Sequence, residues 1–260
     1  MRNLLTVFLF VLLASACRQR AGVPRDRPDT SSVPTATNIL PAKIVAPQAT
    51  TQPRIDGVGD DSCWNQTTWH AIDHNWIGPK YDSIDFAGRY KVAWDKEYLY
   101  ILAEIKDDTL LNTHKPLDNY WDDDCLTVYL DEDHSGGDHQ YTYNAFAYHI
   151  GLDGRIVDMG PDSTAQLYPT HCNVKIDTRG DTATWELAFR LFPHTYKGDV
   201  KDKPVNLFDG KRIGFAIAYN DNDRSPMREN MIGSVYIDGQ NRNLAWITAD
   251  VFGDLFLEGR

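Results

Sequence analysis

The chain has 260 residues, of which 42% are hydrophobic and 12% aromatic, and its formal net charge is −11. Phosphate groups repel a protein this acidic, so the composition argues against nucleic acid and anionic lipid surfaces as partners. The four cysteines form no Cys-x-x-Cys pair, which leaves no zinc motif. Cys63, Cys125 and Cys172 leave open either one disulfide or buried free thiols.

Residues 1–17 have the plan of a secretory signal. Arg2 precedes an apolar run from Leu4 to Ala14, and small residues lead to Cys17. The run is shorter than the about 20 residues that span a bilayer. Its Ala-Ser-Ala-Cys ending resembles a bacterial lipoprotein signal, which would make Cys17 the lipidated first residue of the mature chain. We expect a membrane-anchored lipoprotein, periplasmic or on the cell surface, with a soluble secreted form as the alternative.

Residues 18–52 are rich in Pro, Thr, Ser and Ala and have few large apolar side chains. Such a segment cannot bury enough surface to offset the entropy lost on ordering, so we expect a disordered tether. Fully extended it would reach about 100 Å. Ile44 and Val45, near its end, are candidates for an edge strand.

Residues 53–260 suit one domain and show mostly β signals. The only helical turn is expected at 60–66, and no segment shows a long 3.6-residue period. The expected strands are 86–94, 98–106, 126–130, 141–150, 156–159, 173–177, 184–191, 213–219, 234–237 and 252–257. About ten strands joined by short polar turns predict an all-β fold, an antiparallel β-sandwich of jelly-roll-like type.

The stretch 119–133 combines a tryptophan, an acidic turn and a strand. Because side chains alternate in a strand, two sets of residues share a face each. The core set is Leu126, Val128 and Leu130, and the opposite set is Cys125, Thr127 and Tyr129. Trp121 is expected at the lip of the sheet as a ligand-facing ring, since aromatic faces stack on flat, hydroxyl-rich rings. The alternative is a packing tryptophan that closes one end of the sandwich.

Several short motifs follow one another along residues 54–257. They are Arg54-Ile55-Asp56-Gly57 with Trp64; Val92-Ala93-Trp94-Asp95 with Tyr98-Leu99-Tyr100; Lys106-Asp107; Trp121-Asp122-Asp123-Asp124 before Tyr129-Leu130-Asp131; Ile213-Gly214-Phe215 before Asn220-Asp221; and Trp246 before Phe252-Gly253. In this order and spacing they resemble carbohydrate-binding modules of family nine, part of the DOMON-like superfamily of haem- and sugar-binding sandwiches.

The resemblance implies that two tryptophans grip a sugar ring, usually at the reducing end of a glucan or xylan chain. These positions are Trp121 and Trp246, and their ring faces would lie about 7–8 Å apart, twice the usual contact distance. Asn243 matches a family asparagine that would bind a hydroxyl of the same sugar.

Two polar positions differ from the family pattern. A glutamate is replaced by Thr127 and a glutamine by Ala218, so a weaker or altered sugar preference is expected. Tyr148 or His149 stands near the position of a family arginine.

The turn Ser135-Gly136-Gly137 is surrounded by Asp131, Asp133 and Asp138. Carboxylate oxygens in a flexible turn suit Ca²⁺, and the resemblance implies structural calcium in this kind of loop. A solvated hairpin tip is the alternative.

Three functions remain open. The expected one is a tethered, noncatalytic domain that binds an oligo- or polysaccharide and supports its catabolism. Haem binding would need an axial Met and His, for which the candidates are Met159, Met227, Met231 and His149. Glycoside hydrolysis would need two carboxyl groups about 5–9 Å apart, which the consecutive Asp122-Asp123-Asp124 are poorly placed to supply.

Overall fold

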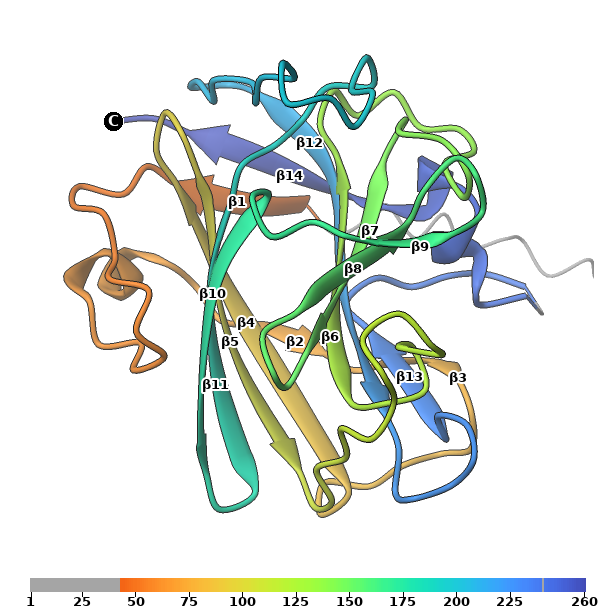
Figure 1. The fold of residues 1–260 in the computed structure, drawn as a ribbon. Coiled ribbons are helices and arrows are strands. Elements are labelled where there is room, and N and C mark those ends of the chain that lie inside the picture. Colours follow the sequence, from red (N-terminus) through yellow and green to blue (C-terminus); the bar gives the residue numbers. More distant parts are fainter. Residues whose placement is uncertain (1–42, 240) are drawn as a thin grey trace, which may run out of the picture. The chain divides into compact units, whose positions relative to one another are not determined.

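The computed structural model describes residues 43–239 and 241–260, which form two β-sheets (Figure 1). The expected signal with Cys17, and residues 18–42 of the expected tether, lie outside the described residues. None of the helices in the described part is long and apolar enough to cross a membrane. The two sheets confirm the predicted antiparallel β-sandwich, in which one pair of strands, described below, is parallel.

One sheet has nine strands in the order β1-β14-β12-β6-β7-β8-β9, with β13 joining β12 to β3. Its strands are β1 (Lys43–Pro47), β3 (His74–Ile77), β6 (Cys125–Asp131), β7 (Phe146–Gly151), β8 (Ile156–Met159), β9 (Ala165–Leu167), β12 (Arg212–Asp221), β13 (Asn230–Gly233) and β14 (Gly253–Glu258). The other sheet has five strands in the order β10-β11-β5-β4-β2. They are β2 (His70–Ile72), β4 (Phe86–Trp94), β5 (Leu99–Asp107), β10 (Cys172–Arg179) and β11 (Thr182–Phe189).

Three short 3₁₀ helices accompany the sheets: η1 (Ser62–Gln66), η2 (Leu244–Trp246) and η3 (Ala249–Val251). The expected helical turn at 60–66 is confirmed as η1. The strands at 86–94 and 156–159 have the predicted bounds, but the strand expected at 141–150 begins only at Phe146, because the amide of Thr142 turns back to His139 O at 3.0 Å. The prediction of a strand at 234–237 was wrong, because β13 ends at Gly233.

The fold begins earlier than the expected boundary at residue 53. β1 pairs in parallel with β14, and Ile44 lies opposite Leu255 with its side chain buried. This confirms the edge strand suggested by Ile44 and Val45 and corrects the tether at its C-terminal end. The polar average composition of residues 18–52 obscured a short strand in which buried and exposed side chains alternate. This strand pairs with the open edge of the sheet.

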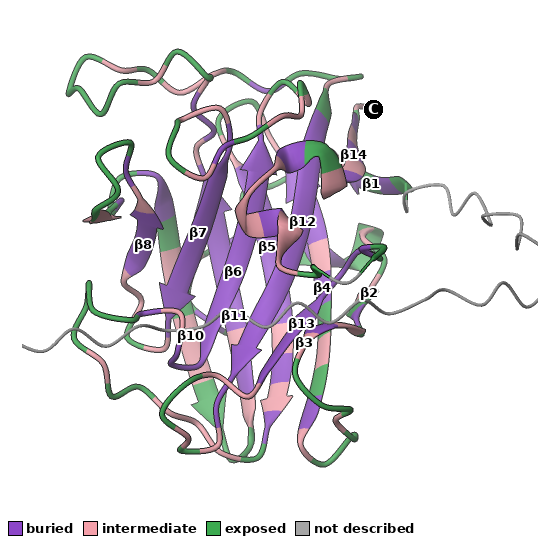
Figure 2. Cartoon of the chain, turned by 90° about the vertical axis from the view of Figure 1, so that its right-hand side faces the viewer, coloured by how far each residue is buried: buried purple, intermediate pink, exposed green. Residues whose placement is uncertain are grey.

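The main core lies between the two sheets. Leu126, Val128 and Leu130 point into it from β6, and Trp185 and Leu187 point into it from β11. The predicted core face of β6 is therefore confirmed. Burial extends over both faces of β6, β7 and β12, which are buried along nearly their whole length (Figure 2). A second layer must therefore cover the outer face of the nine-stranded sheet.

That outer face is built from small side chains at its centre. Ala147 on β7 and Ala216 and Ala218 on β12 flank the central strand β6 and pack under a covering cluster that includes Trp76 and Phe252. Small residues leave room above the sheet for the segments before β6 and after β13. The candidate site lies in this layer.

Candidate functional site

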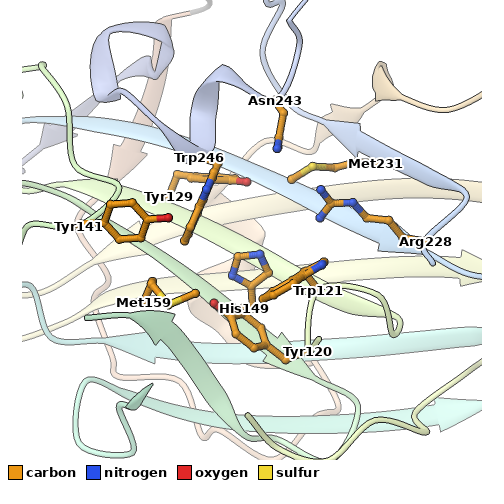
Figure 3. A pocket seen from close by; sticks show the side chains of 10 residues that line it. All are labelled: Tyr120, Trp121, Tyr129, Tyr141, His149, Met159, Arg228, Met231, Asn243 and Trp246. Atoms are coloured by element: carbon orange, nitrogen blue, oxygen red, sulfur yellow. The ribbon is translucent and has the colours of Figure 1, made fainter. Parts of the chain in front are cut away.

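A pocket of about 240 Å³ opens on the outer face of the nine-stranded sheet (Figure 3). It is lined by Tyr120, Trp121, Tyr129, Tyr141, His149, Met159, Arg228, Met231, Asn243 and Trp246. Four residues predicted from the sequence meet here, namely Trp121, Trp246, Asn243 and His149. Thr127 and Tyr148 are not among the lining residues.

Trp121 belongs to the turn that precedes β6. The amide of Asp122 donates to Asn119 O at 2.8 Å, and Asn119 has a positive φ of 47°, which closes the turn. The Trp121 ring packs edge-on against Tyr120, with centroids 5.0 Å apart and planes at 75°. The turn therefore presents a half-buried indole at the rim of the pocket rather than in the core.

The three aspartates after Trp121 hold this turn in place. Asp123 accepts from the amides of Thr113 and His114 at 3.0 and 2.8 Å and pairs with Arg155 at 3.2 Å. Hydrogen bonds to these backbone amides contribute to holding the pKa of Asp123 below its usual value despite burial. These carboxylates serve as anchors outside the pocket, which removes the acid–base pair considered for glycoside hydrolysis.

Trp246 and Asn243 lie on the opposite side of the pocket. Asn243 precedes η2, and its carbonyl accepts from the Trp246 amide at 3.2 Å. The helix is fixed from below by buried His139, whose Nε2 donates to Ala245 O at 2.9 Å. The Trp246 ring packs edge-on against Tyr141, with centroids 6.5 Å apart.

His149 forms the floor between the two tryptophans. Its ring lies 5.0 Å from Tyr120 and 6.4 Å from Trp246, measured between centroids. Nδ1 donates to Ala147 O at 2.9 Å, which makes Nε2 a free acceptor in the neutral ring. Burial, followed by the charge of Arg228, lowers the pKa of His149 to about 3. The ring is therefore neutral at physiological pH.

Strand alternation separates Tyr148 from His149. Tyr148 faces the inter-sheet core, where its hydroxyl hydrogen-bonds His171 Nδ1 at 2.6 Å. Of the two candidates for the family arginine position, His149 alone reaches the pocket. Thr127 is fully buried in the row between His149 and Ala218, so it lies beneath the pocket wall.

Sequence reasoning missed Arg228. The residue lies near the family motifs but belongs to none of them, so no motif marked it as a site residue. It comes from the loop between β12 and β13, and its side chain points into the pocket (Figure 3). The aromatic residues Tyr120, Tyr129 and Tyr141 were also missed as lining residues. Tyr129 could have been found from its place on the outward face of β6 together with Thr127.

The expected calcium loop is joined to η3, the short helix that follows Trp246 in the chain. The amide of Gly137 donates to Asp250 Oδ1 at 2.7 Å, and the amide of Ala249 donates to Gly137 O at 2.9 Å. Burial and the neighbouring Asp133 raise the pKa of Asp131 to about 6. These contacts dock the loop beside η3.

Two other sets of carboxylates are closer together in the described part of the chain. Asp107, Asp221 and Asp223 have ligand atoms within 4.8 Å of one another, as do Asp85, Asp108 and Asp223. The set Asp131, Asp133 and Asp138 does not meet this distance. Burial, reinforced by Asp107, raises the pKa of Asp221 to about 8, and its Oδ1 is buried without a hydrogen-bond partner.

Free thiols are found at Cys63, Cys125 and Cys172, all of them buried. Burial raises the pKa of Cys125 to about 12, so this thiol is inert. The alternative of buried thiols is confirmed for these three positions.

Parts of two longer enzymes are similar in sequence to this chain. Endo-1,4-beta-xylanase A of Thermotoga maritima is 26% identical over 208 residues, which cover 79% of this chain and 17% of that protein. Exoglucanase XynX of Acetivibrio thermocellus is 24% identical over 209 residues, covering 80% of this chain and 16% of that protein. The chain thus spans less than a fifth of the length of these relatives.

A solved structure shares the fold. It is a carbohydrate binding module of family 9 from Caldicellulosiruptor kristjanssonii in complex with cellotriose, with a TM-score of 0.62 and 20% identity, covering 84% of this chain and 95% of that one. Residues 55–260 match the sequence profile described as carbohydrate family 9 binding domain-like. Because this match covers most of the sequence, the chain belongs to the family 9 carbohydrate-binding domains.

Proposed function

We propose that the pocket binds a sugar ring of an oligo- or polysaccharide between Trp121 and Trp246, without catalysis. The observation that carries this proposal is that two half-buried indoles, Trp121 and Trp246, line the same pocket from different segments of the chain (Figure 3). Trp64, Trp76 and Trp94 each donate their ring N–H to a protein acceptor. The ring N–H groups of Trp121 and Trp246 have no acceptor among the described residues, and both rings are half-buried at the pocket.

Stacking supplies affinity and the polar groups supply orientation. Each Å² of sugar C–H surface covered by the indoles contributes about 25 cal/mol. The Asn243 amide and His149 Nε2 offer a donor and acceptors at the same pocket. The Tyr120 hydroxyl is buried there without a protein partner, so it is available to a ligand oxygen.

The lining supports binding rather than hydrolysis. None of its ten residues, all within the described ranges, is a carboxylic acid. Glycoside hydrolysis needs a pair of carboxyl groups beside the scissile bond. The relatives named above are xylanase and exoglucanase enzymes several times longer than this chain, which supports a role beside glycan-degrading enzymes.

A glycan array probed with the purified chain, followed by calorimetric titration of each hit, tests this function. We expect saturable binding of at least one saccharide, accompanied by a change in tryptophan fluorescence. An array without any bound saccharide would contradict the proposal.

Haem binding within the DOMON-like superfamily is the second candidate. His149, Met159 and Met231 line the pocket, whereas Met227 is 67% exposed and lies outside the lining. The volume of about 240 Å³ is below the roughly 300–1,000 Å³ of pockets for drug-sized ligands, which disfavours a macrocycle. A Soret band in the visible spectrum of the purified chain would favour haem over sugar.

We also propose a structural calcium ion at Asp107, Asp221 and Asp223. The buried, unpartnered Oδ1 atoms of Asp221 and Asp223 support it, because an ion would supply the missing partner. Asp107 is oriented by the Tyr219 hydroxyl, which donates to its Oδ2 at 2.7 Å. This set replaces Asp131, Asp133 and Asp138 as our first choice.

The proposal of a membrane anchor rests on the sequence of residues 1–17 alone. A lipid on Cys17 would hold the sugar-binding domain outside the cytoplasm. Replacing Cys17 by Ser should move the protein from the membrane fraction to the soluble fraction. Unchanged fractionation would contradict anchoring through this residue.

A further inference from the structure

Arg228 brings a positive charge into the pocket without an acidic partner. Its Nη1 reaches only a neutral acceptor, Asn220 Oδ1, at 3.4 Å. Arg155 and Arg212 each pair with an aspartate, whereas Arg228 forms no ion pair with any described residue. Arg228 is the one arginine in the described lining, so its unpaired charge faces any ligand that enters the pocket.

The side chains around Arg228 in the pocket lining do not neutralise its charge. The other lining residues are aromatic, thioether, amide and imidazole side chains. His149 is neutral because burial and Arg228 itself lower its pKa to about 3. Arg228 is therefore the one charged group in the described lining at neutral pH. A ligand that covers it with an uncharged surface would leave a buried cation without a counter-ion, which is unfavourable.

The loop holds Arg228 in place before any ligand binds. Its amide donates to Asp122 Oδ1 at 3.2 Å, which joins the loop to the turn that carries Trp121. The next amide, of Glu229, donates to Asp221 O at 2.8 Å. Within the loop, the amide of Ser225 donates to Asn222 Oδ1 at 2.8 Å. These bonds fix the backbone of the loop, so the ligand does not have to order it on binding.

We propose that the sugar bound in this pocket carries an acidic group, either the carboxylate of a uronic acid or a sulfate ester, which Arg228 binds. This inference rests on the proposed function, since the tryptophans hold the ring whose substituent meets Arg228. The planar guanidinium donates two parallel N–H groups, a geometry that matches a carboxylate or sulfate. Arg228 thereby selects among sugars that the two indoles would otherwise bind alike.

Matched pairs of sugars test this selection. The purified full chain is titrated calorimetrically with methyl glucuronide against methyl glucoside, and with methyl galacturonide against methyl galactoside. Each pair differs only in a carboxylate or hydroxymethyl group at C6. A third arm compares glucose 6-sulfate with glucose, which distinguishes sulfate from carboxylate.

We expect the acidic member of at least one pair to bind about tenfold tighter, or more, at low salt. Raising the ionic strength from about 0.01 M to 1 M shortens the Debye length from about 30 Å to 3 Å, so it should weaken the acidic sugar selectively. Equal affinities within every pair would overturn this inference and leave the proposed function standing. Failure of all these sugars to bind would overturn this inference, and failure of the whole glycan array would overturn the proposed function as well.

Variants assign the selection to Arg228. Arg228→Gln should abolish the preference for the acidic sugar by weakening its binding more than that of the neutral sugar, and Arg228→Lys should keep part of the preference. Arg224→Gln is the matched control, because Arg224 is an exposed residue of the same loop outside the lining and loses the same charge. A preference that survives Arg228→Gln in a variant with unchanged melting temperature would overturn the proposal.

Discussion

Trp64 on one outer face of the sandwich has the opposite role to Trp121 and Trp246 on the other. Over the five-stranded sheet, Trp64 is 2% exposed and its ring N–H donates to Glu186 Oε1 at 3.2 Å. Glu186 Oε2 also accepts from the amides of Asp56 and Gly57 at 3.0 and 2.8 Å. The segment before β2 thus covers this face and satisfies the polar groups that it buries with Trp64.

Over the nine-stranded sheet, the covering segments leave a pocket instead of a seal. Trp121 and Trp246 keep free ring N–H groups, and Arg228 lacks a counter-ion among the described residues. Residue type alone therefore does not distinguish a packing tryptophan from a binding one. The distinction lies in whether the half-buried ring lines a pocket together with polar groups that have no protein partner.

The largest expected effect tests the sealed face. Trp64→Ala should reduce the free energy of unfolding by about 3–5 kcal/mol, the usual cost of truncating a large buried aromatic residue. Urea denaturation measures this loss. The sugar affinity of the folded fraction should stay unchanged, because Trp64 lies on the other face. Lost affinity without lost stability would contradict the comparison.

The acidic end of the sandwich, where β5 and β12 finish, belongs to neither face and tests the proposed ion. Calcium at a hundredfold excess over its dissociation constant should stabilise the fold by roughly 3 kcal/mol, because it binds only the folded state. Melting with and without chelator measures the shift. Asp221→Asn should remove the shift, and Asp133→Asn is the control that should retain it. The reverse pattern would return the ion to the loop at Asp131 and Asp133.

Truncation of the pocket tryptophans sharpens the other side of the comparison. Trp121→Ala and Trp246→Ala should each weaken sugar binding by on the order of 1–3 kcal/mol, by analogy with stacking on bases. The melting temperature should change little. Trp69→Ala is the matched control, since this half-buried ring lies on the opposite face beneath Arg89. A loss of stability as large as that of Trp64→Ala would make the two indoles packing residues.

The smallest effect concerns the neutral floor of the pocket. His149 has a pKa of about 3 when folded, against 6.5 when unfolded, so the unfolded state binds more protons between these values. Stability is therefore complete above pH 6.5 and is lost as the pH falls, by at most about 1.4 kcal/mol per unit from this residue.

The difference between the wild-type protein and His149→Gln isolates this contribution. Urea denaturation of both proteins at pH 6.5 and 5 should show a smaller loss of stability in the variant. Other buried histidines titrate in both proteins and cancel in the difference. Parallel losses would show that His149 is more accessible to protons than its burial indicates.

Much of the fold could be predicted because alternation reports burial directly. Leu126, Val128 and Leu130 were assigned to the core from their spacing alone, and β4 was placed with its bounds. The start of the domain was misplaced because β1 is short and depends on pairing with β14, which a local pattern does not contain. The same limit applied to β3, whose one pairing partner in the described sheet, β13, lies far along the chain.

The site was predicted only where a local motif carried it. Trp121, Trp246 and Asn243 follow from the family resemblance, and alternation then separates His149 from Tyr148. Arg228 could not be predicted, because it reaches the pocket through a loop whose position depends on Asp122, about a hundred residues earlier in the chain. Hydrogen bonds between distant segments have no signature in a single sequence.

The pocket is assembled from parts that mutation can change one at a time. Trp121 precedes β6, Trp246 lies on η2, and Arg228 belongs to the loop between β12 and β13. A change in the length or charge of that last loop would leave the two indoles and their supports in place. The scaffold therefore offers protein engineers, and natural variation, a way to exchange the charge preference of a sugar receptor while retaining its grip on the ring.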